Sequence, residues 1–144
     1  MRNAFYNCYS LTSINITHFD TSNVTDMGAM FANCRLLKSI DLSNFKTPLL
    51  FNIVYMFEGC SSLTSIDLSS FNTNEFIYIN NLFENCIKLS YIDISSFTSF
   101  LTYYNKDIFK NISHSCKIIV NKNIITETLE MFRALKMDWK VIIK

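Results

Sequence analysis

The stretch that decides the fold spans residues 60–71 and reads CSSLTSIDLSSF. Its pattern of one cysteine, three aliphatic side chains and a closing phenylalanine occurs four times in the chain. The copies begin at Cys8, Cys34, Cys60 and Cys86, so the repeat has a constant 26-residue period. A fixed period of this length is typical of architectures in which each repeat stacks on its neighbours.

The second half of each copy predicts a short β-strand. Ile66 and Leu68 are two residues apart, so their side chains point to the same face of an extended strand, and Asp67 between them points to the other face. One strand per repeat, always in the same chain direction, predicts a parallel sheet. Adjacent strands would then lie about 5 Å apart.

A second apolar pattern precedes each cysteine. Met27, Met30 and Phe31 are spaced as on the inner face of a helix, which predicts about one turn of α- or 3₁₀-helix per repeat. No repeat can bury its own inner face, so we expect adjacent repeats to cover it. Phenylalanine recurs in this pattern with the same period, at Phe5, Phe31, Phe57, Phe83 and Phe109.

These residues resemble the BspA-type leucine-rich repeats, in the variety also known from Mycoplasma lipoproteins. The family pattern runs approximately N-V-T-x-M-x-x-M-F-x-x-C-x-x-L-x-x-L-D-L-S-x-F-x-T-S, and residues 20–45 and 60–73 follow it closely. Residues 47–55 and 76–82 keep only its apolar positions. The resemblance implies a leucine-rich-repeat-like α/β solenoid in a cell-surface or secreted protein that serves adhesion or the binding of a host or partner.

The pattern divides the chain into a repeat domain, residues 1–116, and a C-terminal cap, residues 117–144. We expect the cap to contain a strand at residues 118–120, a helix that begins after Asn123, and a short closing strand around Val141 and Ile142. Apolar residues at helical spacing mark the helix, and one tryptophan follows it: Ile125, Leu129, Phe132, Leu135 and Trp139.

The repeat domain starts in the middle of a repeat, because Met1 occupies the position of Met27. The sequence shows neither a signal segment nor an atypical capping unit before this point. We therefore expect either a longer chain or pairing with another molecule at the uncapped N-terminal repeat.

Composition excludes several functions. The 144 residues carry a formal net charge of +1, which argues against nucleic-acid binding, since binding to phosphates needs a basic surface. No apolar run is long enough to span a membrane. Only two glycines and one proline are present, so flexible linkers and a second globular domain are not expected.

The outward polar side chains of the strands form the candidate binding surface. Acidic residues on adjacent repeats would attract a cation or a basic ligand. The alternative is that aspartate is only the soluble residue of the repeat. Calcium needs six to eight oxygen ligands and no loop gathers so many, so we predict neither metal nor cofactor. The candidate residues are Asn15, Asp41, Asp67, Asp93, Ser39, Ser65 and Tyr91.

The five cysteines, which we place in one column with Cys116 last, are expected to be mainly buried free thiols. Five is an odd number, so complete pairing within the chain is impossible, and no local C-x-x-C cluster suggests zinc. Disulfides between repeats remain an alternative. Cys116, His114 and Asp107 could be assembled into a catalytic set, but no further residue orients them, and we predict a protein without enzymatic activity.

The sequence therefore favours a non-enzymatic interaction module that binds a protein or a surface glycan through its strand face. Tyrosines that do not fit the core positions, such as Tyr78, would add to such a surface. Two alternatives stay open: a structural spacer in a longer surface array, and an intracellular interaction module.

Overall fold

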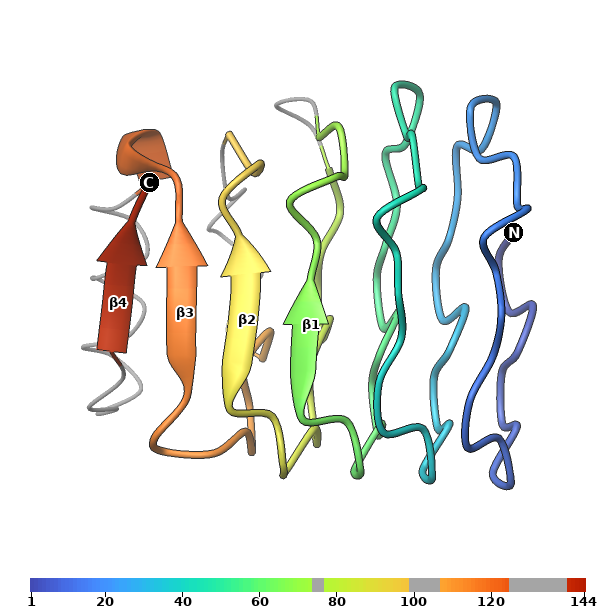
Figure 1. Cartoon of the computed structure of the whole chain (residues 1–144), viewed down its shortest axis with the longest axis horizontal. Helices are drawn as coiled ribbons and strands as arrows, with labels where there is room; N and C mark the ends of the chain where they lie inside the picture. Colours follow the sequence, from blue (N-terminus) through green and yellow to red (C-terminus); the bar gives the residue numbers. More distant parts are fainter. Residues whose placement is uncertain (74–76, 99–106, 125–139) are drawn as a thin grey trace.

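The computed structural model of the chain describes residues 1–73, 77–98, 107–124 and 140–144. Within these residues it contains one parallel sheet of four strands and almost no helix (Figure 1). The strands follow one another in chain order: β1 (Ser65–Asp67), β2 (Tyr91–Ile94), β3 (Lys117–Val120) and β4 (Lys140–Ile143). The single assigned helix of the described residues is the 3₁₀-helix η2 (Lys122–Ile124).

The register of the sheet confirms the predicted period and the parallel direction. Ile66 of β1 lies beside Ile92 of β2, and Ile92 lies beside Ile118 of β3, each one full period further along the chain. All three side chains are buried, as the alternation predicted. The periodic step therefore continues through β3, although the sequence motif of the earlier copies is lost there.

The strands predicted in the first two copies are not formed. Residues 13–16 and 39–42 carry no strand assignment. Side chains supply hydrogen bonds in this part of the chain, where Asn44 Nδ2 donates to the carbonyl oxygens of Ile16 and Thr17, at 3.1 Å each. Ile14 and Ile40 are also only partly buried, so less apolar contact holds these segments extended.

Consecutive segments nevertheless lie side by side from the N-terminus onward, continuing the row of strands (Figure 1). In the segments that come just before each cysteine in the chain, backbone N–H groups of one copy donate to carbonyl oxygens of the next copy. The N–H of Phe31 donates to Met56 at 2.9 Å, and that of Phe57 donates to Leu82 at 3.1 Å. These bonds hold adjacent loops side by side, as the hydrogen bonds between neighbouring strands do in a parallel sheet.

The core consists of the apolar columns that the sequence predicted. Phe31 stacks on Phe5 at a centroid distance of 5.3 Å and on Phe57 at 5.7 Å, and Phe83 continues the column at 6.2 Å from Phe57. Phe31, Phe57 and Phe83 are fully buried. Adjacent repeats therefore do cover one another's inner faces, and this expectation is confirmed.

The turn of helix expected in each repeat is not found in the described residues. Met27, Met30 and Phe31 are buried as predicted, but the backbone there forms separate turns, with N–H of Met30 bonded to Met27 and N–H of Cys34 bonded to Phe31. Residues in the left-handed conformation interrupt each copy, and a right-handed helix cannot pass through them. They form two columns: Asn3, Ala29, Tyr55 and Asn81, and then Asn7, Asn33, Gly59, Asn85 and Asn111.

The C-terminal expectations have mixed outcomes. Val141 and Ile142 lie in β4, and residues 118–120 lie in β3, so both predicted strands are confirmed. The helix predicted from Ile125 to Leu135 lies outside the described residues, and so does Trp139. In the described part of the chain, no helical segment has both the length and the apolar character needed to span a bilayer.

Candidate binding surface

The side chains of the predicted acidic column accept hydrogen bonds from backbone N–H groups two residues later in the chain. Oδ1 of Asp41 accepts the backbone N–H of Ser43 at 2.9 Å, and Oδ1 of Asp67 accepts that of Ser69 at 2.8 Å. Asn15 does the same with Thr17 at 3.1 Å. Such a bond to the backbone two residues later fixes the turn that follows, both after β1 and after the corresponding extended segments of the first two copies. The hydrogen bonds from Ser43 also hold the pKa of Asp41 below its usual value.

Asp41 and Asp67 lie together at the surface. Both side chains are exposed, and they border one hollow of about 300 Å³. The hollow opens where two consecutive repeats meet, just past the ends of their strand segments. Carboxylates and hydroxyl groups form only slightly more of its lining than apolar atoms do. Its lining consists of Ile40, Asp41, Leu42, Ser43, Asp67, Ser69 and Ser70.

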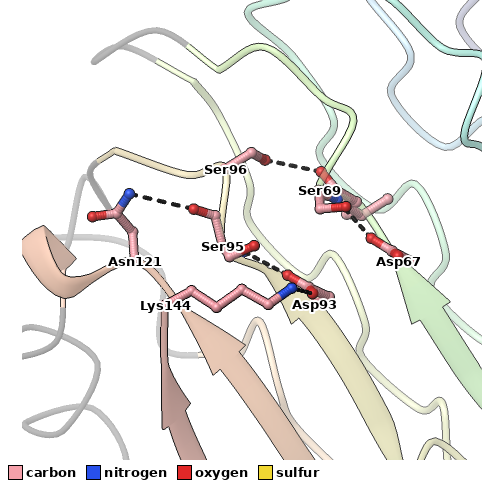
Figure 2. A network of polar contacts seen from close by, with 8 residues as sticks. Asp67, Ser69, Asp93, Ser95, Ser96, Asn121 and Lys144 are labelled. Atoms are coloured by element: carbon pink, nitrogen blue, oxygen red, sulfur yellow. Dashed lines mark hydrogen bonds and ion pairs between the residues drawn. The ribbon is translucent and has the colours of Figure 1, made fainter.

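Asp93, the third aspartate of the column, is buried rather than outward in solvent, with an exposed fraction of 1%. Lys144, the residue after β4, extends across the sheet so that its Nζ lies 2.5 Å from Oδ2 of Asp93 (Figure 2). The predicted exposed acidic stripe is therefore wrong at this position and ends at Asp67. Next in register comes an apolar residue, Ile119.

The environment of Asp93 keeps its carboxylate charged. Burial acts to raise the pKa of Asp93, but the Lys144 ammonium and the hydroxyl and N–H of Ser95 outweigh it and leave the pKa below its ordinary value. In return, the hydrogen bond to Asp93 raises the pKa of Lys144. Sequence reasoning missed Lys144 because it lies 51 residues from Asp93 and belongs to no repeat.

The remaining predicted site residues do not line the hollow. Asn15, Ser39 and Ser65 are exposed, and both the backbone N–H and the hydroxyl of Thr17 bond Oδ1 of Asn15. Tyr91 is half-buried, and the Lys117 ammonium lies 5.6 Å from the centroid of its ring. The structure therefore confines the acidic hollow to the second and third copies, whereas lysine side chains lie beside Asp93 and Tyr91.

A column of threonines was overlooked in the sequence. Thr21 is buried, and its Oγ1 donates to the carbonyl of Lys46 and accepts the N–H of the same residue, both at 2.9 Å. Thr47 makes the same pair of bonds with Asn72 in the next repeat. The signal was present, since Thr21, Thr47 and Thr73 recur with the common period. These threonines join adjacent turns and so position the segments that carry the hollow.

The cysteines are free thiols, as expected, and those after Cys8 are buried. The Sγ of Cys34 lies 3.2 Å from the carbonyl oxygen of Phe5, and equivalent thiol–carbonyl contacts follow in the next two repeats. Cys116 is not part of this column, contrary to our prediction. Ile112, which comes one full period after Cys86, occupies the position and is buried.

Two of the residues considered for catalysis, Cys116 and His114, differ in their surroundings. Burial raises the pKa of the Cys116 thiol to about 12, which opposes formation of a thiolate nucleophile. His114 is exposed, and no hydrogen bond joins it to Cys116 in the described residues. The described ranges also hold no group of three or more His, Cys, Asp or Glu side chains suited to a metal ion.

Comparison with known proteins places the chain in a family. The model of the family described as "Mycoplasma protein of unknown function, DUF285" matches residues 1–123. The chain belongs to this family. The matched region of this DUF285 protein contains all the cysteine-led copies, the acidic hollow and strands β1 to β3. Searches of the curated proteins and of the solved structures returned no match.

Proposed function

We propose that this DUF285 protein is a non-enzymatic interaction module that binds a protein or a surface glycan through the acidic hollow between Asp41 and Asp67. The observation that carries the proposal is the hollow itself, which places two exposed carboxylates on one opening of about 300 Å³. That volume is at the lower end of the range for ligand sites and suits a single side chain of a partner. A lysine or arginine side chain would find its charge complement there.

The wider setting of the module follows from the family resemblance. We propose a leucine-rich-repeat-like solenoid of BspA type over residues 1–116, closed by a cap over residues 117–144, in a cell-surface or secreted protein. The common register of the sheet and the loop hydrogen bonds between adjacent copies support the solenoid. Surface location and adhesion rest on the resemblance. A repeat surface offers many similar positions to a partner, which suits recognition better than catalysis.

The absence of activity is part of the proposal. The thiols that could serve as nucleophiles are buried, with raised pKa values: about 11 for Cys34 and about 12 for Cys86 and Cys116. The exposed Cys8 has no histidine partner within the described residues. An enzyme would need an activated nucleophile or a paired acid and base near a cleft.

A spacer without a ligand is the competing function, and one observation favours it. Asp41, Asp67 and Asp93 each use Oδ1 to bond the N–H two residues later, so the column is explained by turn formation alone. In a spacer, replacement of these residues would change stability and nothing else.

Binding of a basic probe separates the two functions. Isotope-labelled protein is titrated with a hexa-arginine peptide and, in parallel, with hexa-glutamate, while backbone amide resonances are followed by NMR. We expect saturable shifts at the amides of Ser43 and Ser69, which are bonded to the two carboxylates, with the basic peptide only. The double variant Asp41→Asn with Asp67→Asn should lose these shifts.

The chain offers a matched control for this experiment. Asp20 is also exposed and also accepts the N–H two residues on, from Ser22 at 3.0 Å, but it does not line the hollow. Asp20→Asn should therefore leave the titration unchanged. Equal loss in Asp20→Asn and in the double variant would show nonspecific charge attraction, and shifts that never saturate would favour the spacer.

A further inference from the structure

The outer face of the sheet, which is the face turned away from the core, carries two groups of like charges. Asp41 and Asp67 lie one period apart at the acidic hollow, and both side chains are exposed. Lys117 of β3 and Lys140 of β4 are register partners and form a lysine pair on neighbouring strands. Ile118, which follows Lys117, is buried in the core, so the two lysine side chains start from the outer face. The face is therefore acidic in one place and basic in another.

Neither group is neutralised within its own molecule. Among the described residues, no ion pair joins the two aspartates of the hollow or the two lysines of the pair to an opposite charge. The Lys117 ammonium lies over the ring of Tyr91 instead, 5.6 Å from its centroid. Like charges side by side on neighbouring strands repel each other and lower stability. A partner that brings the opposite charge to each group would relieve this repulsion.

The strand between the two groups presents a neutral centre. β2 lies between β1, which carries Asp67, and β3, which carries Lys117, and these two residues are about 10 Å apart along the row of strands. Asp93 of β2 is paired with the Lys144 ammonium (Figure 2), and Tyr91 is half-buried on the same strand. A two-fold axis that lies between two facing sheets and crosses β2 would exchange the acidic and the basic group. The face is thus self-complementary in charge.

We propose that the outer face of the sheet pairs with the same face of a second copy of this chain, so that the lysine pair of each copy meets the acidic hollow of the other. The charges select this occupant. A purely basic ligand would satisfy the hollow and leave the lysine pair uncompensated, a purely acidic ligand would do the reverse, and a second copy satisfies both at once. The inference rests on the function proposed for the hollow and names the partner whose lysines it receives.

Sedimentation equilibrium of the full chain tests the inference, with a reducing agent present so that the exposed Cys8 forms no disulfide-linked dimer. At low salt we expect monomers and dimers in a concentration-dependent equilibrium, without larger species, because the same patch on both copies closes the assembly. Raising the ionic strength from about 0.01 M to about 0.15 M shortens the Debye length from about 30 Å to about 8 Å, so the dissociation constant should increase by roughly tenfold. A chain that stays monomeric at low salt, or a dimer that is indifferent to salt, overturns the proposal.

Two complementary variants test which charges meet. Asp41→Asn with Asp67→Asn removes the acidic group but keeps both turns, because the asparagine oxygen still accepts the same N–H. Lys117→Glu with Lys140→Glu reverses the lysine pair. Each variant alone should be monomeric, and an equimolar mixture should form heterodimers, since the lysines of the first variant meet the intact hollow of the second. A mixture that associates no better than its components overturns the proposal.

A matched control separates the lysine pair from the overall charge. Lys38→Glu with Lys88→Glu makes the same change in net charge at two exposed lysines outside the pair, and it should dimerise as the unaltered chain does. Equal loss of dimer in this control overturns the proposal. Should the reversed lysine variant fail to fold, Lys117→Gln with Lys140→Gln replaces it in the mixture with the same expected result.

The inference and the function proposed for the hollow can fail separately. At concentrations where the chain is monomeric, titration with hexa-arginine reports on the hollow alone through the amides of Ser43 and Ser69. Saturable shifts in a chain that never dimerises overturn the inference and retain the function, with a different partner. A chain that shows neither the shifts nor the dimer overturns both.

Discussion

The Sγ of Cys60 lies 3.1 Å from the carbonyl oxygen of Phe31, in the preceding repeat. The contact joins two adjacent repeats at the edge of the stacked phenylalanine column, and both residues are fully buried. A thiol is small and apolar enough for this interior position and still offers a weak donor to a carbonyl. The column of cysteines is therefore a device for packing and for satisfying backbone acceptors, which agrees with the interpretation of these residues as structural.

The first prediction concerns thiol accessibility. In the native protein at pH 8, only Cys8 should react rapidly with a disulfide reagent, because it is the exposed cysteine, while all five should react after unfolding. Burial raises the pKa of Cys34 to about 11 and of Cys86 to about 12, which further suppresses their thiolates. Absorbance of the released thiolate counts the reactive groups. Cys8→Ser should remove the rapid phase, and a second rapid thiol would contradict the buried column.

The second prediction concerns the phenylalanine column. Phe57 is fully buried and stacks on Phe31 and Phe83, so Phe57→Ala should lower the free energy of unfolding by about 3–5 kcal/mol. Asp67→Asn should change it by less than about 0.5 kcal/mol, because the asparagine oxygen still accepts the N–H of Ser69. Urea unfolding measures both. Similar losses in the two variants would mean that the inner and outer faces are assigned wrongly.

The period and the core were predictable because they repeat. A contact between two adjacent repeats, such as that of Phe31 with Phe57, recurs along the chain, so the constant spacing in the sequence encodes the long-range packing. The turn conformation was also encoded but was not recognised. Asparagine or glycine precedes each of the first four cysteines, and these residue types adopt the left-handed conformation most readily.

The pairing of Asp93 with Lys144 was not predictable in the same way. It occurs once, between a residue of the repeat and a residue outside it, so no periodic signal marks it. The hollow at Asp41 and Asp67 was partly predictable from the sequence. Its residues were visible as a polar column, but only the structure shows that Asp93 is covered and that the exposed part is confined to two repeats.

The third prediction concerns the left-handed positions. Gly59 has φ of 69°, and a Cβ at this residue would lie 2.5 Å from Oδ1 of Asn33, so Gly59→Ala should cost about 1–2 kcal/mol of stability. Ala29 has φ of 52°, so replacing it with glycine should raise the stability of the folded state. Ala29→Gly is expected to stabilise by about 0.5–1 kcal/mol, since relief of strain exceeds the added entropy of the unfolded chain.

Thermal and urea unfolding of the two variants provide the measurement. A matched substitution at a buried position with an ordinary backbone, Ala32→Gly, separates the conformational effect from the general cost of glycine and should destabilise. If Ala29→Gly destabilised as much as Ala32→Gly, the left-handed conformation at Ala29 would be incorrect.

The fourth prediction concerns the ion pair that joins β4 to the sheet. Lys144→Met removes the ammonium partner of the buried Asp93 carboxylate and leaves its bonds to neutral groups such as Ser95, and we expect a loss of about 1–3 kcal/mol at pH 7. This loss of stability is smaller than the loss expected for a fully buried ion pair, because the Lys144 side chain is 55% exposed. Lys122→Met, which removes an exposed lysine without an ion pair in the described residues, is the control and should have little effect.

The same pair predicts an acid dependence with a definite sign. The pKa of Asp93 is lowered in the folded state, so this group contributes stability at pH values above its unfolded pKa of about 3.9 and loses it as pH falls through the folded pKa. In Lys144→Met burial still raises the pKa of Asp93 while the ammonium no longer lowers it, so the folded pKa moves up toward the unfolded value and the stability lost on acidification should become smaller. Asp93→Asn should remove this part of the acid dependence. Urea midpoints between pH 7 and pH 3 test the sign, and an unchanged pH profile in Lys144→Met would show that the ammonium does not control the charge of Asp93.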